Sequence, residues 1–424
     1  MSEDRVLIAG GGIAGLVMGL TLHQIGVPFT VFESARDMRP LGVGINLQPN
    51  AVRELIDLGL EDALPAIGVA TEEYGFYSQT GKEIWTEPRG LLAGYAWPQY
   101  SVHRGELQML LYRTVVERLG EQAVALGTRA VAYQNTAHGA SLTVDERGAA
   151  STIDGSVVVA ADGLHSAIRA QMVPGEGPPI WSGALLWRGA TTAKPFRTGA
   201  SMALIGHATQ RFVTYPISAT DPTSGEALVN WIAELKFDPS SGWNREDWNR
   251  RADRSDFIDE FRDWRFDWID CAGLIEATEE IFEYPMVDRD PLDAWTDGHV
   301  TLMGDAAHIM YPVGSNGASQ AIVDARKLGR AFIDHGVGAE ALQRYEAEMR
   351  PATAAMVLAG RSAGPDSVLQ MVEDRCGGEF DDIELVMPHA ERAELAASYK
   401  RTAGFSIEEL NARPPTIPPG ARVG

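Results

Sequence analysis

The stretch that decides the fold lies at the start of the chain, where residues 5–15 read Arg-Val-Leu-Ile-Ala-Gly-Gly-Gly-Ile-Ala-Gly. The apolar run at 5–9 is typical of a buried parallel strand. Apolar residues at helical spacing follow over 13–26 and end at a glycine that can cap the helix. A second strand is predicted at 28–33, so the chain opens with a complete βαβ unit.

This unit carries the Gly-x-Gly-x-x-Gly spacing of a dinucleotide-binding turn. The first glycine allows the tight turn, the second lets backbone approach a pyrophosphate, and the third lets the helix pack closely on the strand. The helix N-terminus then faces the phosphates with its partial positive charge. The predicted contacts are Gly10, Gly12, Ile13, Ala14 and Gly15. Glu33 ends the second strand, where an acid accepts hydrogen bonds from an adenosine ribose.

A second glycine-containing block begins near residue 299. A strand over 299–303 ends in Gly304-Asp305, and a loop leads to a helix that starts near Gly317. Asp305 is placed to accept a hydrogen bond from a ribitol hydroxyl, although a capping or turn aspartate is the alternative interpretation. The amides of 316–318 can stabilise negative charge on a flavin ring or its phosphates. This block favours FAD over a nicotinamide dinucleotide.

A third block reads Ala161-Asp162-Gly163-x-x-Ser166-x-x-Arg169. An apolar strand runs into an Asp-Gly turn, and the serine and arginine follow one helical turn apart. Taken alone, this pattern fits an ordinary turn and helix equally well.

Together the three blocks resemble the single-component FAD-dependent aromatic hydroxylases, the para-hydroxybenzoate hydroxylase-like group, in order and spacing over residues 5–360. Segments 40–46 (Pro-Leu-Gly-Val-Gly-Ile-Asn), 100–108 and 284–291 look most like the phenazine-modifying branch of that group, which serves the pyocyanin pathway. The resemblance implies that reduced FAD and O2 hydroxylate an aromatic or heteroaromatic small molecule through a flavin hydroperoxide. It implies NADH or NADPH as a transient reductant, because no second glycine motif follows a later strand.

The resemblance also implies FAD contacts outside the glycine turn. They are Arg104, Leu126, Asp162, Asp305, Pro312, Gly314, Asn316, Gly317 and Ala318. One departure affects the adenosine end, because Ser34 follows Glu33 where many relatives carry a basic residue. No metal ligand is indicated, and no catalytic side chain can be named, since the flavin supplies the difficult chemistry.

Substrate-pocket residues are hypotheses drawn from their position beside the flavin loop or in the predicted sheet. The candidates are Tyr215, Trp187, Arg188, Met310 and Tyr311. Trp187 and Arg188 are adjacent in one predicted strand, so alternation places only one of them toward the pocket. His308 follows the Gly-Asp block, and we interpret it as a residue that fixes the loop rather than as a catalytic group.

The predicted fold class is mixed α/β. A Rossmann-like FAD-binding domain occupies 1–180 and 290–360, and a mostly antiparallel substrate-binding sheet domain is inserted at 181–289. A C-terminal helical segment and a Pro-rich tail fill 361–424. A helix is predicted within 243–268, a long helix over 339–362 is expected to break at Pro351, and the tail from 404 is expected to be an extended arm.

Composition narrows the partners. The formal net charge of -22 disfavours nucleic acid and anionic membrane surfaces. No apolar run reaches the roughly 18 residues that span a bilayer, and the two cysteines show no disulfide or metal spacing. We therefore expect a cytoplasmic monomer or homodimer.

Two other functions stay open from the sequence. One is an FAD-dependent oxidoreductase acting on a lipid-like quinone precursor, and the other is a non-catalytic flavin-binding module. A flavin-dependent halogenase is disfavoured because its tryptophan signature is missing.

Overall fold

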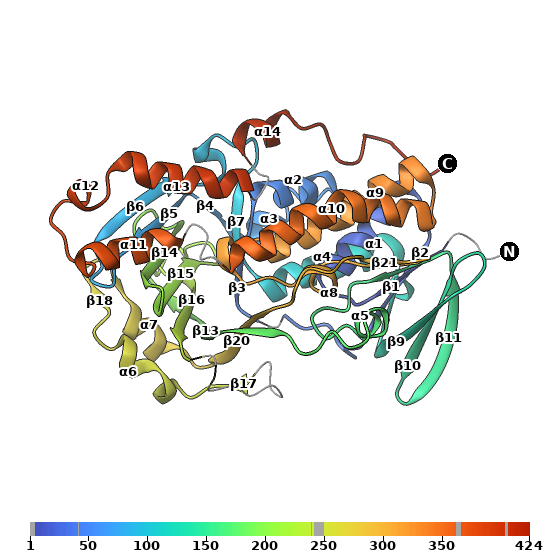
Figure 1. Ribbon diagram of the computed structural model, residues 1–424, viewed down its shortest axis with the longest axis horizontal. Coiled ribbons are helices and arrows are strands. Elements are labelled where there is room, and N and C mark those ends of the chain that lie inside the picture. Colours follow the sequence, from blue (N-terminus) through green and yellow to red (C-terminus); the bar gives the residue numbers. More distant parts are fainter. Residues whose placement is uncertain (1–4, 41, 239, 241–249, 362–365, 403–405) are drawn as a thin grey trace.

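The computed structural model describes residues 5–424, apart from 41, 239, 241–249, 362–365 and 403–405. Two sheets dominate it. In Figure 1 a parallel sheet lies at the right, near both termini, and a larger sheet lies at the left.

The parallel sheet has the strand order β21-β22-β12-β1-β2-β8. Every neighbouring pair in it is parallel except β21–β22. The strands are β1 (Val6–Ala9), β2 (Phe29–Glu33), β8 (Val124–Leu126), β12 (Val157–Ala160), β21 (Thr296–Asp297) and β22 (Val300–Leu302). The chain leaves this sheet after β12 and returns at β22, as the discontinuous Rossmann-like interpretation requires.

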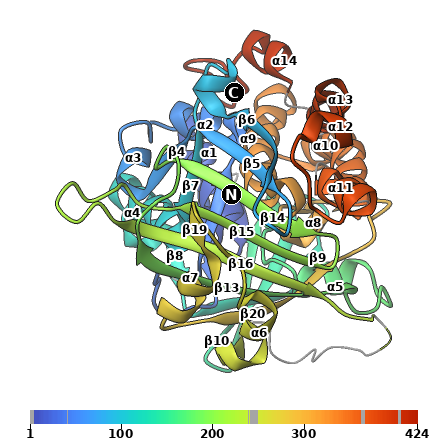
Figure 2. The same ribbon diagram turned by 90° about the vertical axis from the view of Figure 1, so that its left-hand side faces the viewer.

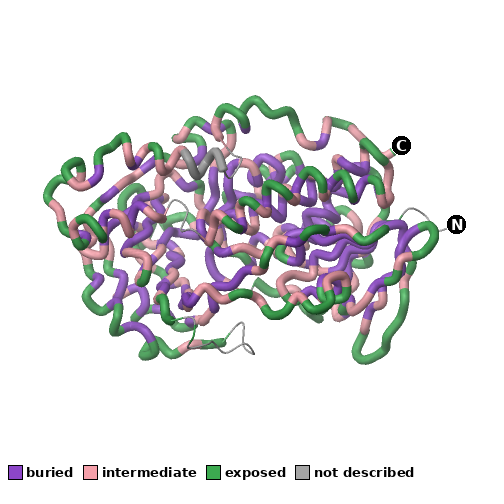
Figure 3. Tube along the Cα trace, in the orientation of Figure 1, coloured by how far each residue is buried: buried purple, intermediate pink, exposed green. Residues whose placement is uncertain are grey.

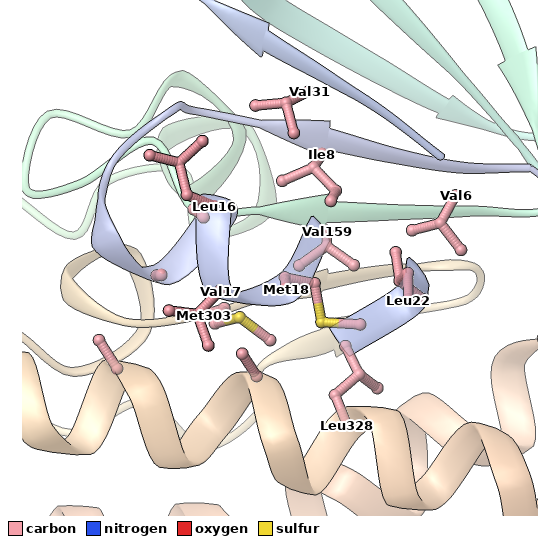
Figure 4. Close-up of a cluster of buried hydrophobic side chains, with 14 of the residues drawn as sticks. Val6, Ile8, Leu16, Val17, Met18, Leu22, Val31, Val159, Met303 and Leu328 are labelled. Atoms are coloured by element: carbon pink, nitrogen blue, oxygen red, sulfur yellow. The ribbon is translucent and has the colours of Figure 1, made fainter. Parts of the chain in front are cut away.

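Helices cover this sheet and form the main core. They include α1 (Ile13–Ile25), α2 (Pro49–Asp57), α4 (Arg104–Leu119), α9 (Gly317–His335) and α10 (Ala339–Gly360). Figure 4 shows Ile8 and Val31 of the sheet facing Leu16 of α1, while Val17 and Met18 lie toward α9. Each of these side chains is fully buried, which stabilises the fold by about 1.5–3 kcal/mol per large apolar residue. In Figure 3 the buried trace follows the parallel sheet and α1.

A three-stranded antiparallel unit projects beside the parallel sheet. It consists of β9 (Thr128–Asn135), β10 (Ala140–Glu146) and β11 (Ala149–Gly155). Its tip is exposed in Figure 3. A second small sheet, β3 (Gly44–Leu47), β7 (Gln99–His103) and β4 (Gly68–Thr71), joins the flavin-side helices to the larger sheet.

The larger sheet has the order β17-β20-β13-β16-β15-β14-β5-β6, and Figure 2 looks onto it. Its strands are β5 (Glu73–Tyr77), β6 (Glu83–Pro88), β13 (Ile180–Ala193), β14 (Ser201–His207), β15 (Gln210–Pro216), β16 (Ala227–Lys236), β17 (Arg250–Arg251) and β20 (Phe282–Asp288). All neighbouring strands are antiparallel except β14 and β5. The range 181–289 left out β5 and β6, because their partner β14 lies more than a hundred positions away and leaves no local signal.

The two faces of the larger sheet have different coverings. One face packs against α6 (Ile258–Phe261) and α7 (Cys271–Ala277) through an aromatic cluster that includes Trp231, Phe257 and Phe261. On the opposite face, α11 (Ser367–Cys376) and α12 (Ile383–Val386) cover the β5–β14 half. The β13–β16–β20 half of that face is turned toward the loop after β22.

Three expectations about helices and the tail are wrong. The described part of 243–268 contains only short pieces, including β17, α6 and β18 (Arg265–Phe266), because its aromatic residues pack onto the sheet rather than along one helix face. Helix α10 continues through Pro351 to Gly360. The tail is packed, since Ile417 is buried and the Val423 amide donates to the Ile25 carbonyl at 3.1 Å.

Helix α13 (His389–Thr402) and helix α14 (Ile407–Ala412) complete the chain. Within the described ranges, no helix combines the length and the apolar character needed to cross a bilayer.

A buried ion cluster under α11 gives a pH-dependent prediction. Arg211 is shared by Glu234 and Asp366, and the Arg211–Asp366 distance is 3.1 Å. Burial raises the pKa of Asp366 to about 6, although Arg211 opposes this rise, and Glu234 adds to it. A carboxyl whose pKa is higher in the folded than in the unfolded state costs stability as pH rises between the two values.

We expect Asp366→Asn to match the wild type in stability near pH 4. It should become the more stable protein by about 1–3 kcal/mol above pH 6, since two pKa units correspond to about 2.7 kcal/mol. Urea denaturation at a series of pH values measures this difference. A wild type that gains stability relative to the variant as pH rises from 4 to 6 would contradict the assignment.

Candidate functional site

The glycine turn before α1 is built of two packed glycines and one open glycine. Gly10 has φ +104°, and a Cβ there would lie 2.3 Å from the Ala161 carbonyl oxygen. A Cβ on Gly15 would lie 2.0 Å from the Gly10 oxygen. At Gly12 a Cβ would meet nothing within 4 Å, and no side chain caps α1. The first amides of α1 therefore face open space, as an anion-binding helix terminus requires.

Glu33 is fixed at the carboxyl end of β2. Its carboxylate accepts hydrogen bonds from the amides of Gly11 and Ala35, each at 2.7 Å. Leu126 pairs with Glu33 in the register of β8 and β2, so the two predicted adenosine contacts lie side by side. Gln108 of α4 also reaches this turn, donating to the Gly11 carbonyl at 2.8 Å. The sequence analysis assigned no role to Gln108, because a glutamine within a helix carries no motif.

The Asp-Gly block after β12 is tied to the Gly-Asp block after β22. Asp162 accepts from the Ala167 amide at 3.0 Å through one oxygen, and its other oxygen is buried without a partner among the described residues. Burial raises the pKa of Asp162. Arg169 is almost fully buried and donates to the carbonyls of Ala306 and Ala307 at 2.8 and 3.0 Å. The two blocks therefore form one edge of the parallel sheet.

The Gly-Asp block presents its carboxylate to solvent. Asp305 is the exposed first residue of α8 (Asp305–His308). Gly314 has φ +70° and Ser315 has φ +57°, and this left-handed turn delivers the chain to Asn316 at the start of α9. No side chain caps α9, and a Cβ on Gly317 would meet nothing within 4 Å. A second open helix N-terminus thus lies at the same sheet edge.

His308 is buried behind the Gly-Asp block. Its Nε2 lies 2.5 Å from an Asp324 carboxylate oxygen, which also accepts the Gly304 amide at 3.1 Å. Burial alone would lower the pKa of His308, but the charge of Asp324 and its hydrogen bond raise it above the ordinary value. Asp324 thereby holds both ends of the Gly304–His308 turn, which supports a loop-fixing role.

Replacing His308 by leucine should lower stability by about 1–3 kcal/mol, because Asp324 loses a charged hydrogen bond in a buried setting. Turnover per bound flavin should stay within a few-fold of the wild type. Flavin content, thermal unfolding and turnover test both statements. Full flavin content with a lost rate would instead make His308 a catalytic residue.

The sheet face turned toward the flavin-side loop contains polar groups. Arg188 of β13 donates to the Gly44 carbonyl at 2.8 Å, and Asn230 of β16 accepts the Gly44 amide at 2.7 Å. A Cβ on Gly44 would lie 2.8 Å from the Tyr215 ring. The Tyr215 hydroxyl interacts with Arg188 and Asn46, while burial raises its pKa to about 12. The sequence analysis missed Gly44 and Asn230, which gave no motif outside this packing.

The other pocket candidates separate. Trp187 stacks on Phe257 at 4.6 Å between ring centroids on the opposite face of the sheet, so its place among the pocket candidates is wrong. Tyr311 packs with Leu186 and Met286 on the face of Arg188. Met310, its neighbour, is partly buried. Arg104 and Pro312 are exposed.

These features fit FAD. Open helix N-termini at Gly12 and Gly317 suit the anionic groups of the cofactor, and Glu33 suits its ribose. The buried unpartnered oxygen of Asp162 is a further acceptor at the same edge. Fold and site together define a flavoprotein with a Rossmann-like cofactor domain and a sheet facing the flavin.

Comparison with known proteins extends this conclusion. Residues 3–359 match the model of the FAD binding domain family, and the chain belongs to that family. It is 46% identical over 366 residues, 85% of its own length and 90% of the relative's, to phenazine 1,6-dicarboxylic acid hydroxylase PhzS of Lysobacter antibioticus. It is 30% identical to 3-hydroxybenzoate 6-hydroxylase 1 of Aquipseudomonas alcaligenes over 76% of this chain and 79% of that one.

The fold also agrees with a solved salicylate hydroxylase substrate complex. The TM-score is 0.73 at 21% identity, with 97% of this chain and 99% of that chain covered. The protein is a flavoprotein monooxygenase that uses FAD and NAD(P)H to hydroxylate an aromatic small molecule. The predictions of fold class, family and cofactor are confirmed.

Proposed function

We propose that this chain hydroxylates an aromatic carboxylate, with a planar fused-ring heteroaromatic acid as its preferred substrate. The observation that carries this proposal is the polar sheet face around Arg188, which lies across from the predicted flavin loop. The relatives named above act on phenazine 1,6-dicarboxylic acid and 3-hydroxybenzoate, and both compounds join a planar ring to a carboxylate.

The chain's own residues would bind the cofactor at the edge of the parallel sheet. Gly12, Ile13 and Ala14 would face the pyrophosphate, and Glu33 would accept from the ribose with Leu126 beside it. Asp162, Asp305 and the start of α9 (Asn316, Gly317 and Ala318) would hold the flavin end, with Arg104, Pro312 and Gly314 around the ring. When bound and reduced, FAD supplies the activation of O2 for transfer to the aromatic ring.

The sheet would orient the substrate and exclude water. Apolar side chains of Leu186, Met286 and Tyr311 form one cluster on the face that also carries Arg188. Such a surface can hold a flat ring, while polar groups beside it fix the orientation. NADH or NADPH would bind transiently and leave.

Steady-state and rapid-mixing measurements test this function. The purified flavoprotein is mixed with NADH or NADPH in the presence of phenazine-1,6-dicarboxylate, 3-hydroxybenzoate and aromatic hydrocarbons of the same ring size. We expect an acid to accelerate flavin reduction and to yield a product heavier by one oxygen atom. If neither acid accelerates reduction while a neutral ring does, the proposed substrate class is wrong.

A further inference from the structure

Arg188 is a buried cation without a negative partner. It lies in the middle of β13, and its described neighbours are the Gly44 carbonyl and the rings of Tyr215 and Tyr284. The Tyr284 ring centroid lies 5.8 Å from the guanidinium carbon. Within the described part of the chain, Arg188 forms no ion pair with a carboxylate, and its Nε atom is buried without a hydrogen-bond partner.

Other buried arginines of this protein are compensated. Each donates to at least one carboxylate; the pairs are Arg169–Glu176, Arg211–Glu234, Arg326–Glu54 and Arg392–Glu384. A buried cation that lacks such a partner is expensive, so proteins rarely keep one without a use. Burial lowers the pKa of Arg188, and the nearby charge of Arg104 acts in the same direction. The local field around Arg188 is therefore positive.

The neighbours of Arg188 supply further donors. Asn230 is fully buried, and because its oxygen accepts the Gly44 amide, its nitrogen must point elsewhere. That nitrogen has no partner among the described residues. The Tyr215 hydroxyl interacts with the same guanidinium. A guanidinium, an amide nitrogen and a phenol hydroxyl together match the acceptor oxygens of a carboxylate.

Arg188 also faces the ring-binding side of the sheet. Its side chain is partly accessible although protein surrounds it, and Tyr284 beside it is partly accessible too. Tyr284 packs against the cluster of Leu186, Met286 and Tyr311, so the cation lies at one end of the apolar surface.

We propose that Arg188, assisted by Tyr215 and Asn230, forms the subsite that binds a carboxylate of the aromatic substrate. This inference rests on the proposed function and deepens it by assigning specificity to named residues. The carboxylate supplies the negative charge that the fold withholds from Arg188. The sealed Nε and Asn230 nitrogen atoms imply that side chains on this face adjust when the acid binds.

The test compares acids with their neutral amides in equilibrium titrations of the oxidised flavoprotein, followed by flavin absorbance. The probes are phenazine-1,6-dicarboxylate, 3-hydroxybenzoate and the corresponding carboxamides. We expect Arg188→Gln to weaken binding of the acid about 10- to 150-fold, as for loss of a charged hydrogen bond. Binding of the amide should change less than about threefold, within the range of an uncharged contact. Arg250→Gln is the matched control, because Arg250 is an exposed cation of the same sheet.

Asn230→Asp gives a second result of opposite sign. The aspartate keeps an acceptor for the Gly44 amide and places a carboxylate beside Arg188. The ligand-free variant should be at least as stable as the wild type, and it should bind the acid about 100-fold more weakly, because the internal carboxylate replaces the ligand's.

Several results would overturn this subsite. Arg188→Gln might keep the preference for the acid, or it might lose the acid and the amide equally, which would make Arg188 structural. A shifted flavin midpoint potential with the acid preference intact would assign Arg188 to the reduced flavin instead. If the wild type binds and hydroxylates the acids and both variants match it, only the subsite fails. If the wild type binds none of the four probes, the substrate class fails and the subsite fails with it.

Discussion

Replacing Gly12 by valine is expected to yield a folded protein that no longer retains FAD. Nothing in the described structure lies within 4 Å of a Cβ at this position, and Gly12 has an extended backbone conformation that other residues adopt readily. The added side chain would therefore not disturb the apoprotein. It would fill the space in front of the first amides of α1, where a pyrophosphate must approach the backbone. We expect FAD affinity to fall at least about 100-fold, or about 3 kcal/mol.

Gly10→Ala is the matched control for this experiment. Its Cβ would lie 2.3 Å from the Ala161 carbonyl oxygen, and its φ of +104° is unfavourable for alanine. It should destabilise the apoprotein itself by at least about 2 kcal/mol. Isothermal titration with FAD and thermal unfolding of the two apoproteins separate the effects. A Gly12→Val protein that binds FAD normally would remove this turn from the cofactor site.

Replacing Arg326 by methionine is expected to cause the largest loss of stability. Arg326 is fully buried in α9 and donates to Glu54 at 3.2 Å and Gln24 at 2.6 Å, and it also pairs with Asp57. One guanidinium thus joins α9 to α1 and α2. Glu54 also accepts from Thr416, so the same network anchors the C-terminal tail.

Removing this arginine leaves Glu54 and Asp57 without their countercharge in a buried setting. Breaking a buried ion pair from one side costs about 3–5 kcal/mol. Arg330→Met is the control, because Arg330 lies one turn later on α9 in an exposed i,i+4 pair with Asp334 and should cost less than about 1 kcal/mol. Urea midpoints of the apoproteins measure both changes. Equal midpoints for the two variants would show that the buried network contributes nothing net.

Local patterns were sufficient for the cofactor half of the fold. Helix α1 ends at Ile25 with Gly26 at φ +81°, as its sequence indicates, and α4 and α9 begin at Arg104 and Gly317. These elements are specified by residues close together in the chain. Strand alternation also separates Arg188 from Trp187, although it does not tell which of them faces the flavin.

Contacts between distant segments could not be predicted. Strand β5 pairs with β14 across more than a hundred residues, and the tail packs on α1 through Ile417 and Val423. The grip of Arg188 and Asn230 on Gly44 joins three strands from different parts of the chain. Asp324 is a similar case, because its bond to the Gly304 amide appears only once α9 packs behind β22. These arrangements depend on tertiary packing, which single-sequence patterns do not encode.

The account's central claim is that this flavoprotein transfers one atom of O2 to an aromatic carboxylate. Its most direct test is single turnover of the NAD(P)H-reduced enzyme with phenazine-1,6-dicarboxylate under ¹⁸O2, followed by mass spectrometry of the product. The account predicts a ring-hydroxylated acid carrying one ¹⁸O atom. An unchanged acid, with all the reducing equivalents recovered as hydrogen peroxide, would contradict it.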